Sequence, residues 1–302
     1  MLVRTGHRGI ATGGAAEPWS GGTETAYGGY TIHTFLTTGP FTVTDLHSTN
    51  IDVLVVAGGG GGYGSWGAWG GGGGAGGMVV CSGKAVTPQE YTVTVGAGGT
   101  GMSNGTDSTF AGIVAKGGGA SGAYQDYDGY DGGSGGGGAG KMTDRGEATQ
   151  NSAGNQGGGT GYGYPGGGWQ TGGSAGGLGW GHDSCGSGGG ASTKGWSAEG
   201  DGPSCVTVGD NWSGTSPGGT GRQNSLRTGS NVWYAGGGAS GRSDGGQTPH
   251  SSVGGLGGGG NGGGYHPNVV ASNGSANTGG GGGGGLSTTG GSGIVVIRYV
   301  TP

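Results

Sequence analysis

The chain has 302 residues, 97 of them glycine, and only 29% of it is hydrophobic and 9% charged, so it cannot build a conventional core along its whole length. Interior glycine costs a helix about 1 kcal/mol relative to alanine, which excludes long helices, and glycine in solid runs with only 9 prolines excludes collagen. The net charge of −5 without a basic stripe predicts no nucleic-acid partner, and the lack of a long apolar run predicts no membrane insertion.

The first 29 residues carry no clear strand pattern, and the GGAAEPWSGG within them is typical of a linker. We therefore expect residues 1–29 to form an N-terminal arm or linker. Strand patterns begin at Tyr30, where YTIHTFL alternates between two faces. IDVLVVA, at 51–57, is a continuous apolar run, which is typical of a strand buried on both faces.

Further short strand patterns follow at 77–82, 91–97 and 108–117, and the last one, GIVVIRYV, lies at 293–300. The economical arrangement pairs this last strand with the first ones. We expect an all-β fold, with a small β-sandwich of jelly-roll or TNF-like type over 30–116, a first glycine insertion at 58–77, and a closing segment at 286–302. The expected core is Ile32, Phe35, Phe41, Val43, Val53, Val55, Val79, Val93, Val95, Phe110, Val114, Ile294, Val296 and Ile297.

Residues 117–285 are dominated by glycine runs that alternate with polar, aromatic-bearing stretches. A flexible linker is the plain alternative, because Gly/Ser-rich chains behave as random coil. Seven tryptophans lie beside or between the glycine runs of the chain, five of them within 117–285, and structureless loops of this length are rare; both observations argue against a linker. We expect a bundle of polyglycine II helices, in which three residues make a turn and each backbone N–H and C=O points sideways to a neighbouring run.

Several motifs resemble catalytic or ligand-binding signatures without their context. VLVVAGGGGGYG follows a strand, but no helix can follow it to hold a pyrophosphate. Asp126, Asp128 and Asp131 nearly match the spacing of a calcium loop, and the alternative is a solvated loop. His182, Asp183 and Cys185 lack a fourth zinc ligand, whereas Cys185 and Cys205 could form a disulfide in a surface loop. The sequence predicts no enzyme, no cofactor and no metal site.

The stretches between the glycine runs are rich in Tyr, Trp, Ser and Asn, which is the composition of recognition loops. The alternative is that these aromatic residues wall the bundle, and we favour that role for Trp66, Trp69, Trp169 and Trp180, which abut the runs. The residues predicted to contact a receptor are Tyr124, Tyr127, Tyr130, Trp196, Trp212, Trp233, Tyr234, Tyr265 and His266.

The segments YTIHTFLTTGPFTVT, VLVVAGGGGG, VWYAGGGASG and GGSGIVVIRYV together resemble the glycine-rich domain of bacteriophage tail-fibre and virion proteins. The alternating runs and loops are also similar to the T-even-type distal tail-tip adhesins, whose runs form a polyglycine II sandwich. The glycine-rich ectodomain of the anaplastic lymphoma kinase family is similar in joining a TNF-like sandwich to glycine helices.

This resemblance implies a non-enzymatic virion protein of a tailed phage, extracellular when mature. Its expected partners are a host cell-surface receptor, either a glycan or an outer-membrane protein, and other virion or tail-fibre proteins, with a homotrimer as one assembly state. The alternative is a purely structural fibre or decoration protein that binds no receptor.

Overall fold

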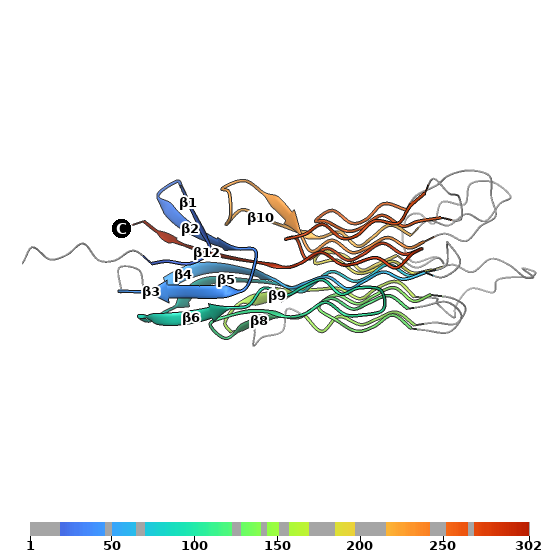
Figure 1. The fold of residues 1–302 in the computed structure, drawn as a ribbon, viewed down its shortest axis with the longest axis horizontal. Helices are drawn as coiled ribbons and strands as arrows, with labels where there is room; N and C mark the ends of the chain where they lie inside the picture. The colour runs from blue at the N-terminus through green and yellow to red at the C-terminus, as the bar shows by residue number, and fades with distance from the viewer. Residues whose placement is uncertain are drawn as a thin grey trace, which may run out of the picture.

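The strands gather at one end of an elongated molecule and the glycine runs extend from them towards the other end (Figure 1). All regular elements in the part of the chain described by the computed structural model are β-strands, which confirms the all-β class. No helix among these residues is long and apolar enough to cross a membrane. The described residues are 19–45, 50–64, 70–122, 128–139, 144–150, 157–168, 185–196, 216–241, 252–264 and 269–301.

The main sheet has six strands in the order β1-β2-β12-β4-β5-β9, and every neighbouring pair is antiparallel. β12 lies between β2 and β4, so the prediction that the last strand pairs with the first ones is confirmed. Its strands are β1 (Thr23–Tyr27), β2 (Tyr30–Phe35), β4 (Asn50–Val56), β5 (Met78–Ala85), β9 (Thr160–Tyr162) and β12 (Ile294–Val300). The other strands form the pairs β3 (Gly39–Val43) with β6 (Gln89–Val93), β7 (Ser108–Phe110) with β8 (Ile113–Ala115), and β10 (Arg222–Asn224) with β11 (Val232–Tyr234).

Strand β4 is buried on both faces, as its continuous apolar run predicts. Its alternate residues enter two different apolar clusters because successive side chains of a strand point to opposite faces. Val53 and Val55 belong to the first cluster, and Leu54 and Val56 belong to the second. The sheet is therefore the middle layer of the strand end.

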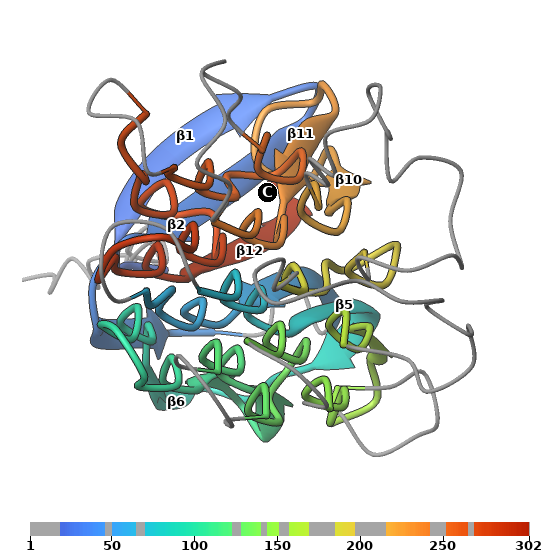
Figure 2. The same ribbon diagram turned by 90° about the vertical axis from the view of Figure 1, so that its right-hand side faces the viewer.

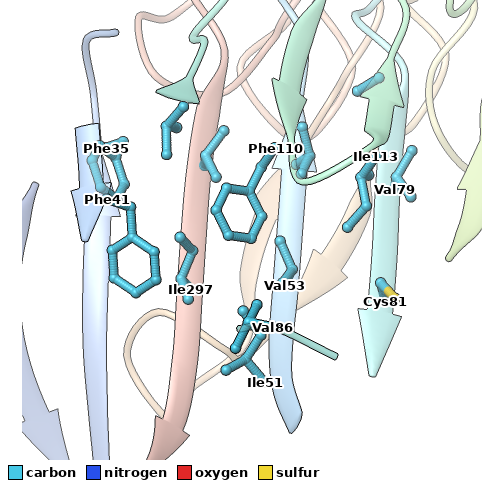
Figure 3. Close-up of a cluster of buried hydrophobic side chains, with 14 of the residues drawn as sticks. Phe35, Phe41, Ile51, Val53, Val79, Cys81, Val86, Phe110, Ile113 and Ile297 are labelled. Atoms are coloured by element: carbon cyan, nitrogen blue, oxygen red, sulfur yellow. The ribbon is translucent and has the colours of Figure 1, made fainter. Parts of the chain in front are cut away.

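The first apolar cluster joins the main sheet to the pairs β3–β6 and β7–β8, which form a second layer of strands (Figure 3). A bridge between Thr94 and Thr109 links these two pairs edge to edge. Most of the predicted core residues belong to this cluster or to the second one. The jelly-roll or TNF-like connectivity stays a prediction.

The segment at 108–117 is a hairpin and not the single strand we expected. Its turn residues Ala111 and Gly112 have φ angles of 46° and 80°, as a two-residue turn of the mirror-image type requires. The turn shifts the alternation, so that Ile113 and Ala115 are buried while Val114, a predicted core residue, is only half-buried. Val95 is likewise only partly buried, at the margin of the first cluster.

The predicted N-terminal arm is wrong from Trp19 onward. Trp19 is fully buried in the first cluster, where its ring lies 4.5 Å from that of Tyr299, centroid to centroid. Strand β1 then pairs with β2 through a turn at Gly28 and Gly29, both with positive φ. The strand end therefore begins within the segment assigned to the arm.

His33 is a buried polar group whose neighbours fix its tautomer. Its Nδ1 lies 2.7 Å from the carbonyl oxygen of Gly21, which can only accept, so Nδ1 carries the proton. Nε2 then accepts from the Tyr299 hydroxyl at 3.1 Å. Burial raises the pKa of Tyr299 to about 12, so this hydroxyl keeps its proton. The core is built around a neutral imidazole.

We expect acid to destabilise the protein through His33. Burial lowers the pKa of His33 below the ordinary histidine value of 6.5, against the raising effects of the Gly21 carbonyl and Glu24. The unfolded chain therefore binds the proton first, and stability falls as pH drops below 6.5, by at most about 1.4 kcal/mol per pH unit. Urea unfolding at neutral pH and at mildly acidic pH measures this, and His33→Gln should flatten the difference. An equal pH slope in both proteins would contradict it.

The glycine runs are joined by a lateral network of backbone hydrogen bonds with a period of three residues. Along the run 70–77, successive N–H groups donate to three different neighbours, and every third group returns to the same neighbour. This is the pattern of a helix with three residues per turn and no internal bonds, and the runs appear as triangles when viewed end-on (Figure 2). With the donor first, the pairs are Gly72 to Gly186 and Ala75 to Gly189, Gly73 to Gly282 and Gly76 to Gly279, and Gly74 to Gly119 and Gly77 to Lys116, at 2.7–3.1 Å.

The carbonyl groups of the same run accept from three further runs. Gly137 and Ser134 donate to Gly72 and Ala75, Gly60 and Ala57 donate to Gly74 and Gly77, and Gly238 donates to Gly73. Six neighbours thus surround this run, which is the packing expected of an interior polyglycine II helix. The bundle is larger than the predicted 117–285, because 57–62, 70–77, 99–106 and 288–293 also belong to it.

The spacing between runs leaves no room for a side chain. At Gly71, Gly73 and Gly76, as at most glycines of the run 70–77, an added Cβ would come within 3.0 Å of a carbonyl oxygen of a neighbouring run. Ala75 is the one residue of this run with a side chain, and it lies in the second apolar cluster with Met78 and Ala191. Glycine is therefore required wherever a run faces another run.

Candidate functional site

The candidate site is the end of the bundle that lies away from the strands. Runs from distant parts of the sequence stop there side by side, as Figures 1 and 2 show for the coloured segments. These run ends border seven segments of the chain that lie outside the described residues. The segments are 65–69, 123–127, 140–143, 169–184, 197–215, 242–251 and 265–268.

The hydrogen-bond network continues up to the residues that border these segments. Gly241 donates to Gly70 at 2.9 Å, and Gly122 donates to Gly137 at 2.9 Å. Gly263 donates to Gly284 at 2.8 Å. The positions at which the connecting segments leave the bundle are therefore fixed relative to one another.

Side-chain oxygens replace the missing neighbour where a run lies at the edge of the bundle. The carboxylates of Asp128 and Asp131 each accept from a backbone N–H, of Asp144 and Glu147 respectively, both at 2.7 Å. Asn104 and Asp107 do the same for Ala120 and Gly117. In each pair the caps are three residues apart, so they repeat with the period of the helix that they cover.

These caps give Asp128 and Asp131 a structural role that the near-match to a calcium loop did not predict. Asp126, the third residue of that motif, lies outside the described residues. Among the described residues there is no group of three or more His, Cys, Asp or Glu that could hold a metal ion. The signal that we missed was polar residues spaced by three beside a glycine run.

Two of the predicted contact residues lie on the bundle. Tyr130 is 40% exposed, and its backbone donates to Ala120 and accepts from Gly136. Trp196 is half-buried, and its backbone N–H donates to the Ser187 hydroxyl at 2.7 Å, close to the border of 197–215. Both side chains are thus carried on hydrogen-bonded backbone.

Trp233 and Tyr234 lie on β11 and not at the bundle end that forms the candidate site. Tyr234 is only 1% exposed and packs in the second apolar cluster with Leu54 and Ile294. A side chain buried in this way cannot contact a receptor, so Tyr234 is a core residue. Trp233 is half-buried beside it, opposite Gln223.

The remaining predicted contacts, Tyr124, Tyr127, Trp212, Tyr265 and His266, lie outside the described residues. The same holds for the four tryptophans that we expected to wall the bundle. Cys185 is buried at the start of its run, but Cys205 lies outside, so the disulfide stays a prediction.

A family model described as a glycine-rich domain covers residues 34–231, which takes in most of the strand end and much of the bundle. No curated protein matches the chain significantly.

Proposed function

The chain belongs to the glycine-rich domain family, and we propose that it works as a rigid scaffold that presents binding loops, as a non-enzymatic adhesin on a phage tail fibre or virion. The observation that carries the proposal is the bundle end, where one hydrogen-bonded lattice fixes the borders of seven connecting segments. Such an arrangement can vary its loops freely while the spacing between them stays constant.

Rigid presentation favours binding in two ways. Loops that are anchored at both ends lose less conformational entropy on binding, which leaves more of the contact energy as affinity. Several copies on one particle would add avidity without new contacts. The proposed partner is a receptor on the host cell surface, a glycan or an outer-membrane protein, and the strand end would join the module to other virion proteins.

The sharpest test exchanges 197–215 for the corresponding segment of a related protein. Its borders are anchored, because Trp196 is held by Ser187 and Ser216 donates to the Ser240 hydroxyl at 3.3 Å. We expect the exchange to lower the affinity of the soluble protein for its original host cells by at least about tenfold. The free energy of unfolding in urea should be unchanged. A matched control exchanges 46–49, which connects β3 to β4 in the chain and is not one of the seven segments.

The outcomes separate the two candidate functions. A labelled soluble protein that binds host cells and competes with adsorption supports an adhesin. If no exchange among the seven segments alters cell binding, the adhesin is excluded and the purely structural fibre or decoration protein takes its place.

A further inference from the structure

The three Asn–Gly steps of the chain share one arrangement within the bundle. They are Asn104–Gly105, Asn261–Gly262 and Asn273–Gly274. In each, the side-chain Oδ1 accepts a backbone N–H from a neighbouring run, that of Ala120 at 2.8 Å, Gly254 at 2.9 Å or Thr289 at 2.9 Å.

The glycine of each step is held as well. Its N–H donates to a carbonyl of the run that the asparagine contacts, which belongs to Gly118, Ser252 or Thr289, in each case at 2.9 Å. At Asn104 the amide nitrogen also donates to the carbonyl of Asp131 at 2.9 Å. The glycine N–H and the side-chain amide group that carries the reacting Cγ are thus both held by hydrogen bonds to neighbouring runs.

That reaction is deamidation, for which Asn–Gly is the most reactive sequence because glycine offers no steric hindrance. The glycine nitrogen loses its proton and bonds to the side-chain Cγ, the Cγ–Nδ2 bond breaks, and ammonia leaves. Water then opens the succinimide ring at one of its two carbonyls, giving aspartate or isoaspartate. The first step needs a free glycine N–H and a side chain that can turn towards it.

We propose that these three Asn–Gly steps are sites of spontaneous deamidation, and that the folded bundle suppresses the reaction there. All three asparagines are exposed, so water reaches their side chains, and burial of the asparagine gives no protection. The protection comes from the two hydrogen bonds, and deamidation starts only where a run opens locally. Opening governs the rate in the same way as it governs amide exchange.

The two products differ in how they fit the lattice. Aspartate can accept the same N–H, as Asp107 does from Gly117 at 2.9 Å. Isoaspartate adds a methylene to the main chain and breaks the three-residue period. Suppression of deamidation therefore protects the bundle, because isoaspartate would leave a permanent defect in a run at its edge.

The test incubates the full chain in mildly alkaline buffer, native and in denaturing urea, and measures deamidation at each site by peptide mapping. We expect at least about tenfold slower reaction in the native protein at all three sites, which equals about 1.4 kcal/mol of opening free energy. Native rates that match the denatured rates at two or more sites would overturn the proposal.

Ala120→Pro removes the hydrogen bond from the Ala120 N–H to Asn104 Oδ1, which we call the clasp on Asn104. Proline suits this backbone geometry but has no N–H to donate. Faster reaction at Asn104 alone, with Asn261 and Asn273 still protected, supports the proposal. An unchanged rate at Asn104 while the other two sites stay protected contradicts the role of the clasp. Asn261→Asp is the matched control: its carboxylate can still accept from the Gly254 N–H, so it should leave the urea midpoint unchanged.

Discussion

Gly73→Ala should destabilise the protein by about 3–5 kcal/mol, one methyl group being enough to open the interior of the bundle. The new Cβ would lie within 3.0 Å of the Gly60 carbonyl oxygen, which accepts from Gly282. Gly73 also donates to Gly282 and accepts from Gly238. Backbone atoms surround the site, so no side chain can swing aside. The free energy of unfolding in urea, followed by circular dichroism, measures the loss.

Gly39→Ala is the matched control. Nothing lies within 4 Å of a Cβ at Gly39, and its φ is not positive. The change should be neutral or slightly stabilising, by up to about 1 kcal/mol, because alanine restricts the unfolded chain. Equal effects of the two substitutions would show that side-by-side packing of bare backbone does not hold the bundle together.

Trp19→Ala should destabilise the protein by about 3–5 kcal/mol, as expected when a fully buried tryptophan is removed. Its ring packs on Phe41 and Tyr299, and its Nε1 donates to Asp45 at 3.2 Å. Thr25→Ala, on the exposed strand β1, serves as control and should change stability by less than about 0.5 kcal/mol. If the two variants have nearly the same free energy of unfolding in urea, Trp19 does not anchor this segment to the core, and the predicted N-terminal arm would extend past it.

Much of the strand end could be predicted because its signal is local. The continuous apolar run of β4 and the alternation of β2 report directly on burial, and β12 repeats the pattern far along the chain. What the sequence could not reveal is structure that depends on distant partners. β1 reads TETAY and is mostly exposed, so only its pairing with β2 makes it a strand.

In the glycine bundle, the type of helix could be predicted from the sequence, but the neighbours of each run could not. Composition and sterics predict the three-residue helices, since bare backbone must find lateral partners. The sequence of a run does not specify which other runs pack beside it, because one glycine run resembles another. Tyr234 shows the limit at the candidate site, since an aromatic residue beside a glycine run can equally wall a core or face a receptor.

The threefold repeat along each run also constrains how such a gene can change. Removing a single codon from the run 70–77 would turn every later residue of that run by a third of a revolution. The methyl group of Ala75 would then face a neighbouring backbone, and the hydrogen-bond partners on all sides would be reassigned. Insertions and deletions inside a run are therefore tolerable only in steps of three codons. A change of length in one of the connecting segments turns no residue within a run, so these segments are where length can vary.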